Sequence, residues 1–188
     1  MIYLAKVPLP RCPFEQIHVA LYSYFPHAVH GERPYVWSIA DGGASILMMS
    51  AMRPATTCAE IHVEAGMTYS FDLTYKRVRN SGKDHTPVEI SSMPELRERI
   101  IKFVGDRGGQ IGFVRLDKMR AIECRKGEHR VRLPIVDAAG QVYVTDAEKF
   151  EALLAGGGPG TGKAYGCGMW RLPELFEPAL VSLTRVAA

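Results

Sequence analysis

Two kinds of apolar pattern follow one another along the first 75 residues. Alternation of apolar and polar residues is typical of a half-buried strand, and apolar residues three or four positions apart are typical of a helix. Phe14, Ile17, Leu21 and Tyr24 have helical spacing. The expected elements are a strand over residues 2–9, a helix over 14–25, a hairpin of strands over 35–40 and 45–52, and a strand over 68–75. Residues 53–67 fit either a degenerate helix or an irregular strand.

The second half of the chain repeats this order. Pro94 begins a helical run that includes Leu96, Ile100 and Val104, and glycines follow where the run stops. The expected elements are a helix from Pro94 to Val104, strands over 111–116, 121–125, 129–136 and 142–144, a helix over 146–154 and a strand over 167–172. The whole order is close to β-α-β-β-α-β written twice. It predicts an α+β fold of tandem ferredoxin-like (RRM-like) domains.

A basic, turn-rich segment, KRVRNSGKDHTP, follows the strand that ends at residue 75 and marks the predicted domain boundary. We expect an N-terminal domain over residues 1–80, a C-terminal domain over 81–172 and an extension over 173–188. The repeat is one of topology only, because the two halves show no sequence self-similarity.

The composition is that of an ordinary folded protein. The chain has 188 residues, of which 47% are hydrophobic, and it holds no apolar stretch as long as the roughly 18 residues of a membrane-spanning helix. Its first residues do not resemble a signal peptide, so we expect a cytoplasmic protein without a membrane partner. The four cysteines form no C-x-x-C pair, and neither a zinc site nor a disulfide framework is expected.

Positive charge is concentrated in the middle of the chain. Residues 76–132 contain 15 Lys or Arg against 8 Asp or Glu, a net charge of +7, whereas the segments before and after each have a net charge of −2. A single basic residue is usually a solvated surface group, but a whole basic segment between acidic neighbours favours a polyanionic partner. Nucleic acid is therefore the leading class of partner.

A glycine-rich loop, GGGPGTGKAYGCG, occupies residues 156–168 between the last expected helix and strand. Backbone N–H groups in such a loop can bind phosphate oxygens, and Lys163 adds a positive charge. The loop almost fits the nucleotide-binding pattern G-x-x-x-x-G-K-[ST], but Ala164 stands where Ser or Thr should hold magnesium. The loop also has the wrong order, helix then strand. We therefore expect no nucleotide cofactor, and we interpret the loop as one that packs and contacts a nucleic-acid backbone.

His18 is the main candidate for catalysis. It lies in the first expected helix, one position from the apolar stripe, with Glu15 three residues before it and Tyr22 four residues after it. One interpretation is a histidine at the helix flank that bonds a neighbour. The other is a general acid or base whose pKa is raised by the Glu15 carboxylate and which assists attack of an RNA 2′-hydroxyl on the adjacent phosphate. Acidic residues are dispersed, and no histidine pair has metal-ligand spacing, so no metal or other cofactor is expected.

Several segments together resemble the CRISPR-associated endoribonucleases of the CasE type. They are IYLAKV at the start, IHVALYSYFP, FDLTYKRVRNSGK, and VTDAEKFEALLAGGGPGTGKAYGCGMWRL, and they cover the chain to about Leu172. The resemblance implies tandem ferredoxin-like domains and a catalytic histidine at His18. It further implies metal-independent cleavage of precursor CRISPR RNA at the 3′ base of the repeat hairpin, leaving a 2′,3′-cyclic phosphate. The enzyme would stay bound to the mature RNA together with other effector-complex subunits.

The resemblance also places the RNA contacts. The family grips the RNA stem with the hairpin that carries Arg125, Lys126, Arg130 and Arg132 here, which is the segment that the charge distribution indicates. We add the basic residues Lys76, Arg77, Arg79 and Lys163 as candidate RNA contacts. The candidate glycines of the loop are Gly158, Gly160, Gly162, Gly166 and Gly168.

Two positions and the C-terminal extension depart from the family pattern. Glu15 stands where members often have tyrosine, with Tyr22 as a candidate substitute, and Val19 stands where a basic residue sometimes follows the histidine. The extension after Leu172 is a candidate helix for docking on a partner subunit. The missing tyrosine gives weight to an alternative, a catalytically inactive subunit that only binds the CRISPR RNA hairpin.

Overall fold

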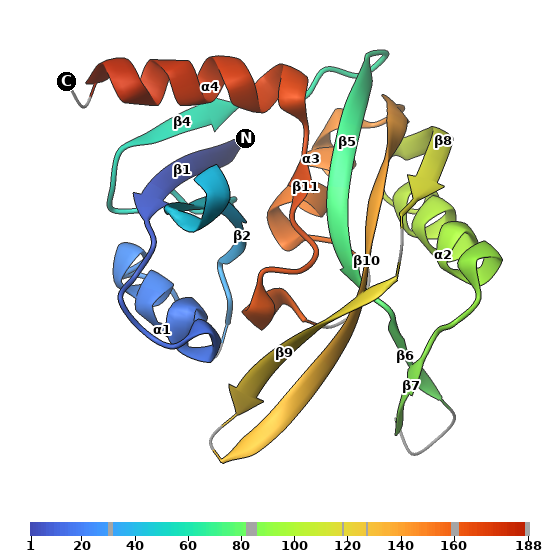
Figure 1. The fold of residues 1–188 in the computed structure, drawn as a ribbon. Helices are drawn as coiled ribbons and strands as arrows, with labels where there is room; N and C mark the ends of the chain where they lie inside the picture. Colours follow the sequence, from blue (N-terminus) through green and yellow to red (C-terminus); the bar gives the residue numbers. More distant parts are fainter. Residues whose placement is uncertain (30–31, 82–85, 118, 127, 159–161, 187–188) are drawn as a thin grey trace.

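The computed structural model describes residues 1–29, 32–81, 86–117, 119–126, 128–158 and 162–186. In these residues two large antiparallel sheets are joined by a shared core, and a third sheet has two strands (Figure 1). The first sheet consists of β1 (Ile2–Pro8), β2 (Tyr35–Ala40), β3 (Ser45–Ser50) and β4 (Cys58–Ile61), in the order β2-β3-β1-β4. The expected hairpin over 35–52 is confirmed, with Ala40 opposite Ser45 at its turn. The expected helix over 14–25 is a short α1 (Ile17–Leu21) between the 3-10 turns η1 (Phe14–Gln16) and η2 (Tyr22–Tyr24).

The second half of the chain repeats this strand order. It contains the elements β5 (Thr68–Lys76), α2 (Met93–Gly105), β8 (Gly109–Leu116), β9 (Arg120–Lys126), β10 (His129–Val144), α3 (Ala147–Gly156) and β11 (Trp170–Arg171). The strand order is β11-β5-β10-β8, and β9 pairs with β10. In both sheets the first strand of the repeat lies between the third and the fourth, with the second at the edge. The predicted class, α+β with tandem ferredoxin-like domains, is confirmed.

The predicted helix starts are also confirmed. Ser92 caps α2 by accepting a hydrogen bond from the Glu95 N–H, and Pro94 occupies the first turn. Asp146 caps α3 in the same way through the Lys149 N–H. These residues satisfy backbone N–H groups that have no partner inside the helix, which explains why each helix begins where its sequence pattern begins.

The long strand β10 differs from the prediction of two strands separated by residues 137–141. It runs unbroken for 16 residues and pairs with β9 at its first half, β8 at its second half and β5 over its middle and end. Gly140 lies within the strand, at a point where the neighbouring backbone leaves no room for a side chain. A Cβ there would lie 2.1 Å from the Phe113 carbonyl oxygen. The basic segment expected to be turn-rich forms a small hairpin of β6 (Val78–Ser81) and β7 (Thr86–Glu89).

The first repeat has no helix between β3 and β4 in the described chain; residues 51–57 are irregular. Two later helices lie against its sheet instead. α3 contacts β1, β2 and β3, and α4 (Pro173–Val186) crosses β1 and β4 (Figure 1). Phe176 of α4 is 4% exposed and belongs to the core. The extension is therefore helical as predicted, but its apolar side packs on its own chain.

One cluster of buried side chains joins the two sheets. It includes Ile2 and Leu4 of β1, Phe71 and Leu73 of β5, and Trp170 of β11. Because β5 pairs with β10 and β11, it belongs to the second sheet, although the predicted boundary at residue 80 assigns it to the first domain. We propose that the division lies between β4 and β5 instead. No helix among the described residues is long and apolar enough to cross a membrane.

Candidate catalytic site and nucleic-acid interface

His18 is half-buried on α1, and its imidazole has an unused hydrogen-bonding atom. The backbone carbonyl of His18 accepts a hydrogen bond from the Tyr35 hydroxyl, whereas Nδ1 of the imidazole is buried without a hydrogen-bond partner in the described chain. Burial lowers the pKa of His18, the charge of Arg33 lowers it further, and the backbone carbonyl of Glu15 acts in the opposite direction. The expectation of a raised pKa is therefore wrong, and the imidazole is predominantly neutral at pH 7.

Glu15 and Tyr22 do not gather around the imidazole. Glu15 lies on η1, which packs against β9, and its charge acts on Cys124 and Tyr165 of the second domain. The Tyr22 hydroxyl donates to the carbonyl of Glu32 at 3.1 Å. Neither side chain forms a hydrogen bond with the His18 ring in the described part of the chain. The helix spacing predicted this contact, but η1 and η2 turn the two side chains to other neighbours.

The structure brings Arg33 to the site, which the sequence analysis did not predict. Its charge lowers the pKa of both His18 and Lys163, and its Nε atom is buried without a hydrogen-bond partner among the described residues. Arg33 lies between η2 and β2, where neither hydrophobic period nor a motif marks it. Arg33 is identified as a candidate site residue by its position in the folded chain and not by its sequence.

The glycine-rich loop lies beside the helix that carries His18. The 3-10 turn η4 (Lys163–Tyr165) contacts α1, and Nζ of Lys163 donates a hydrogen bond to the carbonyl of Gly156. Burial lowers the pKa of Lys163, and the charges of Arg33 and Arg107 lower it further. The loop and His18 are thus neighbours in space although they are far apart in sequence.

The described amides of the loop are mostly used within the protein. Gly158 N–H donates to the Gly168 carbonyl at 2.5 Å, Gly168 N–H to the Thr74 carbonyl at 2.8 Å, and Cys167 N–H to the Gly162 carbonyl at 3.3 Å. The Gly158 and Gly168 amides are therefore occupied within the protein and are not available to a phosphate, whereas the packing role of the loop is supported. Gly160 lies outside the described residues.

Gly166 shows why the loop needs glycine. It has a φ of 73°, and a Cβ at this position would lie 3.0 Å from the Trp37 ring. The neighbouring Tyr165 ring stacks on Phe14 of η1 at a centroid distance of 6.3 Å. Close packing of the loop against the first domain therefore fixes η4 beside α1.

The β9–β10 hairpin has two different faces. Its inner face packs Cys124 and Leu133 with Cys167 of the glycine loop. Its outer face is basic and exposed: Arg125 lies directly opposite Arg130. Arg132, also exposed, lies opposite Glu123 and 3.8 Å from a carboxylate oxygen of Glu89. Lys126 is paired with His129 in the ladder, and its side chain lies outside the described part of the structure.

The three basic residues near the start of β6 have different environments. The guanidinium of Arg77 is buried and donates to the carbonyls of Ile135 and Ile90 and to Glu89, at 3.1, 2.6 and 2.8 Å. Arg77 is therefore not available to a phosphate, which corrects its prediction as an RNA contact. The Lys76 side chain lies against Gly162, and Arg79 is partly exposed, 3.3 Å from a carboxylate oxygen of Glu95.

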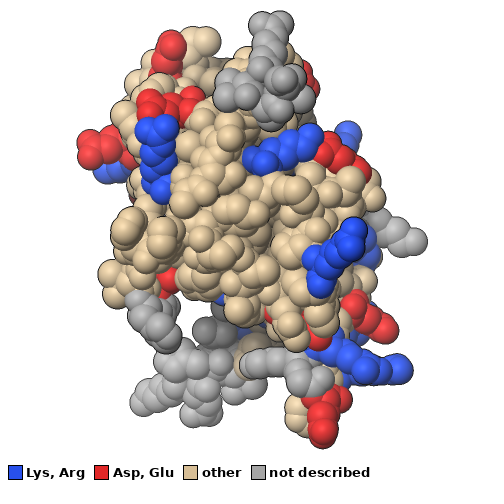
Figure 2. All heavy atoms as spheres, turned by 90° about the vertical axis from the view of Figure 1, so that its left-hand side faces the viewer, with Lys and Arg blue, Asp and Glu red and all other residues tan. Residues whose placement is uncertain are grey.

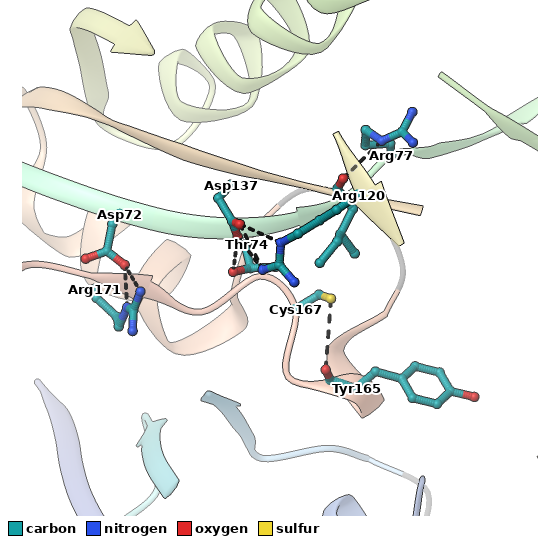
Figure 3. Close-up of polar contacts among 9 residues, drawn as sticks. Asp72, Thr74, Arg77, Arg120, Asp137, Tyr165, Cys167 and Arg171 are labelled. Carbon is teal, nitrogen blue, oxygen red and sulfur yellow. Dashed lines mark hydrogen bonds and ion pairs between the residues drawn. The ribbon is translucent and has the colours of Figure 1, made fainter. Parts of the chain in front are cut away.

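A cavity of about 400 Å³ between the two sheets is bordered by paired charges rather than free ones. The Arg120 guanidinium contacts both oxygens of Asp137, at 2.9 and 3.1 Å, and the Thr74 hydroxyl donates to the same carboxylate (Figure 3). Arg171 pairs likewise with Asp72. These contacts join β9 to β10 and β11 to β5. Because each arginine is paired with an aspartate, the two pairs add no net charge to the border of the cavity.

The outer face of the first domain is poor in charged groups. Figure 2 shows a broad uncharged surface on this side, with lysines and arginines scattered mainly toward its edges. The charged residues of the exposed hairpin come instead from the basic central segment of the chain. No group of three or more His, Cys, Asp or Glu side chains suited to a metal ion occurs within the described ranges.

The family model described as CRISPR associated protein matches residues 12–172, which is most of the chain. The protein belongs to this family. Comparison with curated protein sequences gave no match.

Solved structures of CRISPR proteins share the fold of this family member. A CRISPR endoribonuclease Cse3 bound to 19-nucleotide RNA is 16% identical, with a TM-score of 0.74, covering 92% of this chain and 99% of that one. Thermus thermophilus Cse3 bound to an RNA representing a pre-cleavage complex is 18% identical, with a TM-score of 0.73, covering 91% and 98%. Cas6e from Escherichia coli str. K-12 is 19% identical, with a TM-score of 0.68, covering 90% and 98%.

Proposed function

We propose that this CRISPR-associated protein is a metal-independent endoribonuclease that binds the repeat hairpin and cleaves precursor CRISPR RNA at the 3′ base of the stem. The family match and the likeness to RNA-bound Cse3 support the substrate class. The observation that carries the catalytic assignment is the half-buried, predominantly neutral imidazole of His18 on α1, the helix that contacts η4.

His18 acts as a general base in this proposal. Its neutral imidazole accepts the proton of the RNA 2′-hydroxyl as the 2′-oxygen attacks the adjacent phosphorus. The bond from phosphorus to the 5′-oxygen of the next nucleotide breaks, and that oxygen leaves as it takes up a proton from solvent water. The products carry a 2′,3′-cyclic phosphate and a 5′-hydroxyl, and one proton is accepted and one donated.

The outer face of the β9–β10 hairpin grips the RNA stem in this proposal. Like charges directly opposite one another destabilise a strand pair, yet Arg125 and Arg130 occupy such positions. A phosphate backbone between or beside them would convert this repulsion into attraction. Arg132, Lys126, Arg79, Lys76 and Lys163 remain proposed RNA contacts, and Arg77 does not.

The protein would stay bound to the mature RNA among other subunits of an effector complex. A CRISPR RNA-guided surveillance complex contains a chain that is 14% identical to this one, with a TM-score of 0.65 and coverage of 90% and 98%. This likeness supports the proposed assembly.

An inactive hairpin-binding subunit is the second candidate. It is favoured by the side chains of Glu15 and Tyr22, which are turned to other partners and do not orient the His18 ring. This candidate predicts tight RNA binding without cleavage.

Replacement of His18 by alanine separates the two candidates. We expect the His18→Ala protein to bind repeat RNA normally but to cleave it at least about 100-fold more slowly in EDTA, because it lacks the proton acceptor. Single-turnover cleavage of end-labelled repeat RNA, with binding measured in parallel, gives both quantities.

Val19→Ala is the matched control, since Val19 is the next residue of the same helix and is 60% exposed. Its cleavage rate should stay within about twofold of wild type. Equal cleavage by wild type and His18→Ala would refute the assignment of His18, and binding without any cut by wild type would establish the second candidate.

A further inference from the structure

Two buried polar atoms without partners occur in the same region. Nδ1 of His18 and Nε of Arg33 are both shielded from solvent and have no hydrogen-bond partner within the described residues. Leaving a buried donor or acceptor unsatisfied typically costs about 1–3 kcal/mol. A ligand with polar oxygens, bound beside both residues, would supply the missing partners.

The backbone around Arg33 is held firmly against the helix of His18. Before it, the Glu32 carbonyl accepts the Tyr22 hydroxyl at 3.1 Å; after it, the Pro34 carbonyl accepts the Ser50 hydroxyl at 2.5 Å. The Tyr35 hydroxyl then donates to the His18 carbonyl. Arg33 thus lies in a backbone segment that three hydrogen bonds hold, one each to η2, β3 and α1.

The charge of Arg33 is not neutralised within the described structure. No ion pair there includes Arg33, whereas Arg120 and Arg171 of the inter-sheet cavity each have an aspartate partner. A second cation, Lys163, is close enough that the charge of Arg33 lowers its pKa. Two cationic side chains that repel one another beside a neutral imidazole favour an anionic ligand.

We propose that Arg33 is a further catalytic residue of the cleavage site, where its guanidinium contacts the scissile phosphate beside His18. This inference rests on the proposed function. The phosphate gains negative charge as the 2′-oxygen attacks, and a planar guanidinium donates two parallel hydrogen bonds to such oxygens. Arg33 stabilises that charge, while His18 accepts the proton.

Arg33→Ala tests the inference in the full-length protein with repeat RNA. We expect the single-turnover cleavage rate to fall by about 100-fold or more, and the dissociation constant for the RNA hairpin to change by less than about threefold. Arg33→Lys should recover part of the rate because it restores the charge without the two-pronged geometry. Arg53→Ala, an exposed arginine of the same domain, should cleave at the wild-type rate.

The pH dependence reports on the charge of Arg33 beside His18, separately from the loss of rate. The groups that face His18 are Arg33, the Tyr35 hydroxyl, the Glu15 carbonyl and the η4 turn with Lys163. Only neutral His18 accepts a proton, so the rate rises with pH through its pKa. Removing Arg33 removes a cause that lowers this pKa, and the rising limb should shift to higher pH.

The outcomes separate the inference from the proposed function. If wild type cleaves and His18→Ala does not, but Arg33→Ala keeps the wild-type rate at the pH where cleavage is fastest, Arg33 has no catalytic role and the proposed function stands. If wild type does not cleave, both fail. Should the alanine variant not fold, as judged by its thermal transition, Arg33→Gln and Arg33→Lys decide the matter with the same criteria.

Discussion

At the scale of single residues, burial and pairing separate arginines that look equivalent in the sequence. Arg77 is 4% exposed and gives its donors to two backbone carbonyls and a carboxylate, so it joins the small β6–β7 hairpin to β10. Arg125 and Arg130 lie only a few residues from this junction in the ladder, yet both are exposed and face one another. The first arginine stabilises the fold, whereas the other two form no ion pair among the described residues and are proposed contacts of the RNA.

The double variant Arg125→Ala/Arg130→Ala should therefore weaken RNA binding without lowering the stability of the folded protein. We expect a dissociation constant at least about tenfold higher at low salt and a salt slope smaller by about 2, because about two phosphate contacts are lost. The free energy of unfolding should be unchanged or higher by roughly 0.2–1 kcal/mol, since a like-charge pair is removed. Binding titrations over a range of salt concentrations and chemical denaturation measure these quantities.

Arg97→Ala/Arg99→Ala provides the matched control, with the same change of charge on exposed positions of α2. Its salt slope should equal that of wild type. An equal loss of affinity in both double variants would show that only net charge matters and that the hairpin is not the RNA-binding surface.

At the scale of elements, α4 compensates for the helix that the first repeat lacks. A sheet face of apolar residues must be covered, and α4 covers part of the first sheet with Phe176, Leu175, Ala179 and Leu180. Glu174 adds a hydrogen bond from the Ser70 N–H at 2.9 Å, which ties the helix start to β5. The extension is therefore part of the folded core.

Phe176→Ala should destabilise the protein by about 3 kcal/mol, because it removes a buried aromatic ring and leaves a cavity beneath α4. Denaturant titration measures the free energy of unfolding. Val181→Ala on the same helix, where the side chain is 53% exposed, should change it by less than about 0.5 kcal/mol. A negligible effect of Phe176→Ala would mean that α4 contributes little to the core.

The hydrophobic pattern was sufficient for most elements and insufficient for their contacts. Pro94 at the start of α2, the apolar spacing in α2 and α3 and the alternation in β5 are local signals, and they located their elements. The continuity of β10 through Gly140 depends on pairing with strands that are distant in sequence. Residues 137–141 have no strand pattern of their own, so the sequence predicted a break there. At the site, the position of His18 on a helix was predictable, but the burial of Arg77 and the approach of Arg33 arise only from tertiary packing.

At the scale of the whole molecule, the shared core brings the two halves of the site together. α1 comes from the first repeat and η4 from the second, and packing of Phe14 on Tyr165 and of Trp37 against Gly166 holds them side by side. The basic hairpin extends from the same junction, where β9 contacts η1 (Figure 1). In the proposed mechanism, an RNA stem held by this hairpin ends at His18, so that gripping and cutting belong to one surface.

The most direct test of this account uses repeat RNA with a single 2′-deoxy nucleotide immediately 5′ of the cut, incubated with wild-type protein in EDTA. The account predicts normal binding and no cleavage of this RNA, because the attacking oxygen is absent, whereas the all-ribose RNA is cut and its 5′ fragment ends in a 2′,3′-cyclic phosphate. Cleavage of the deoxy RNA at the same position, or loss of all-ribose cleavage in EDTA, would contradict it.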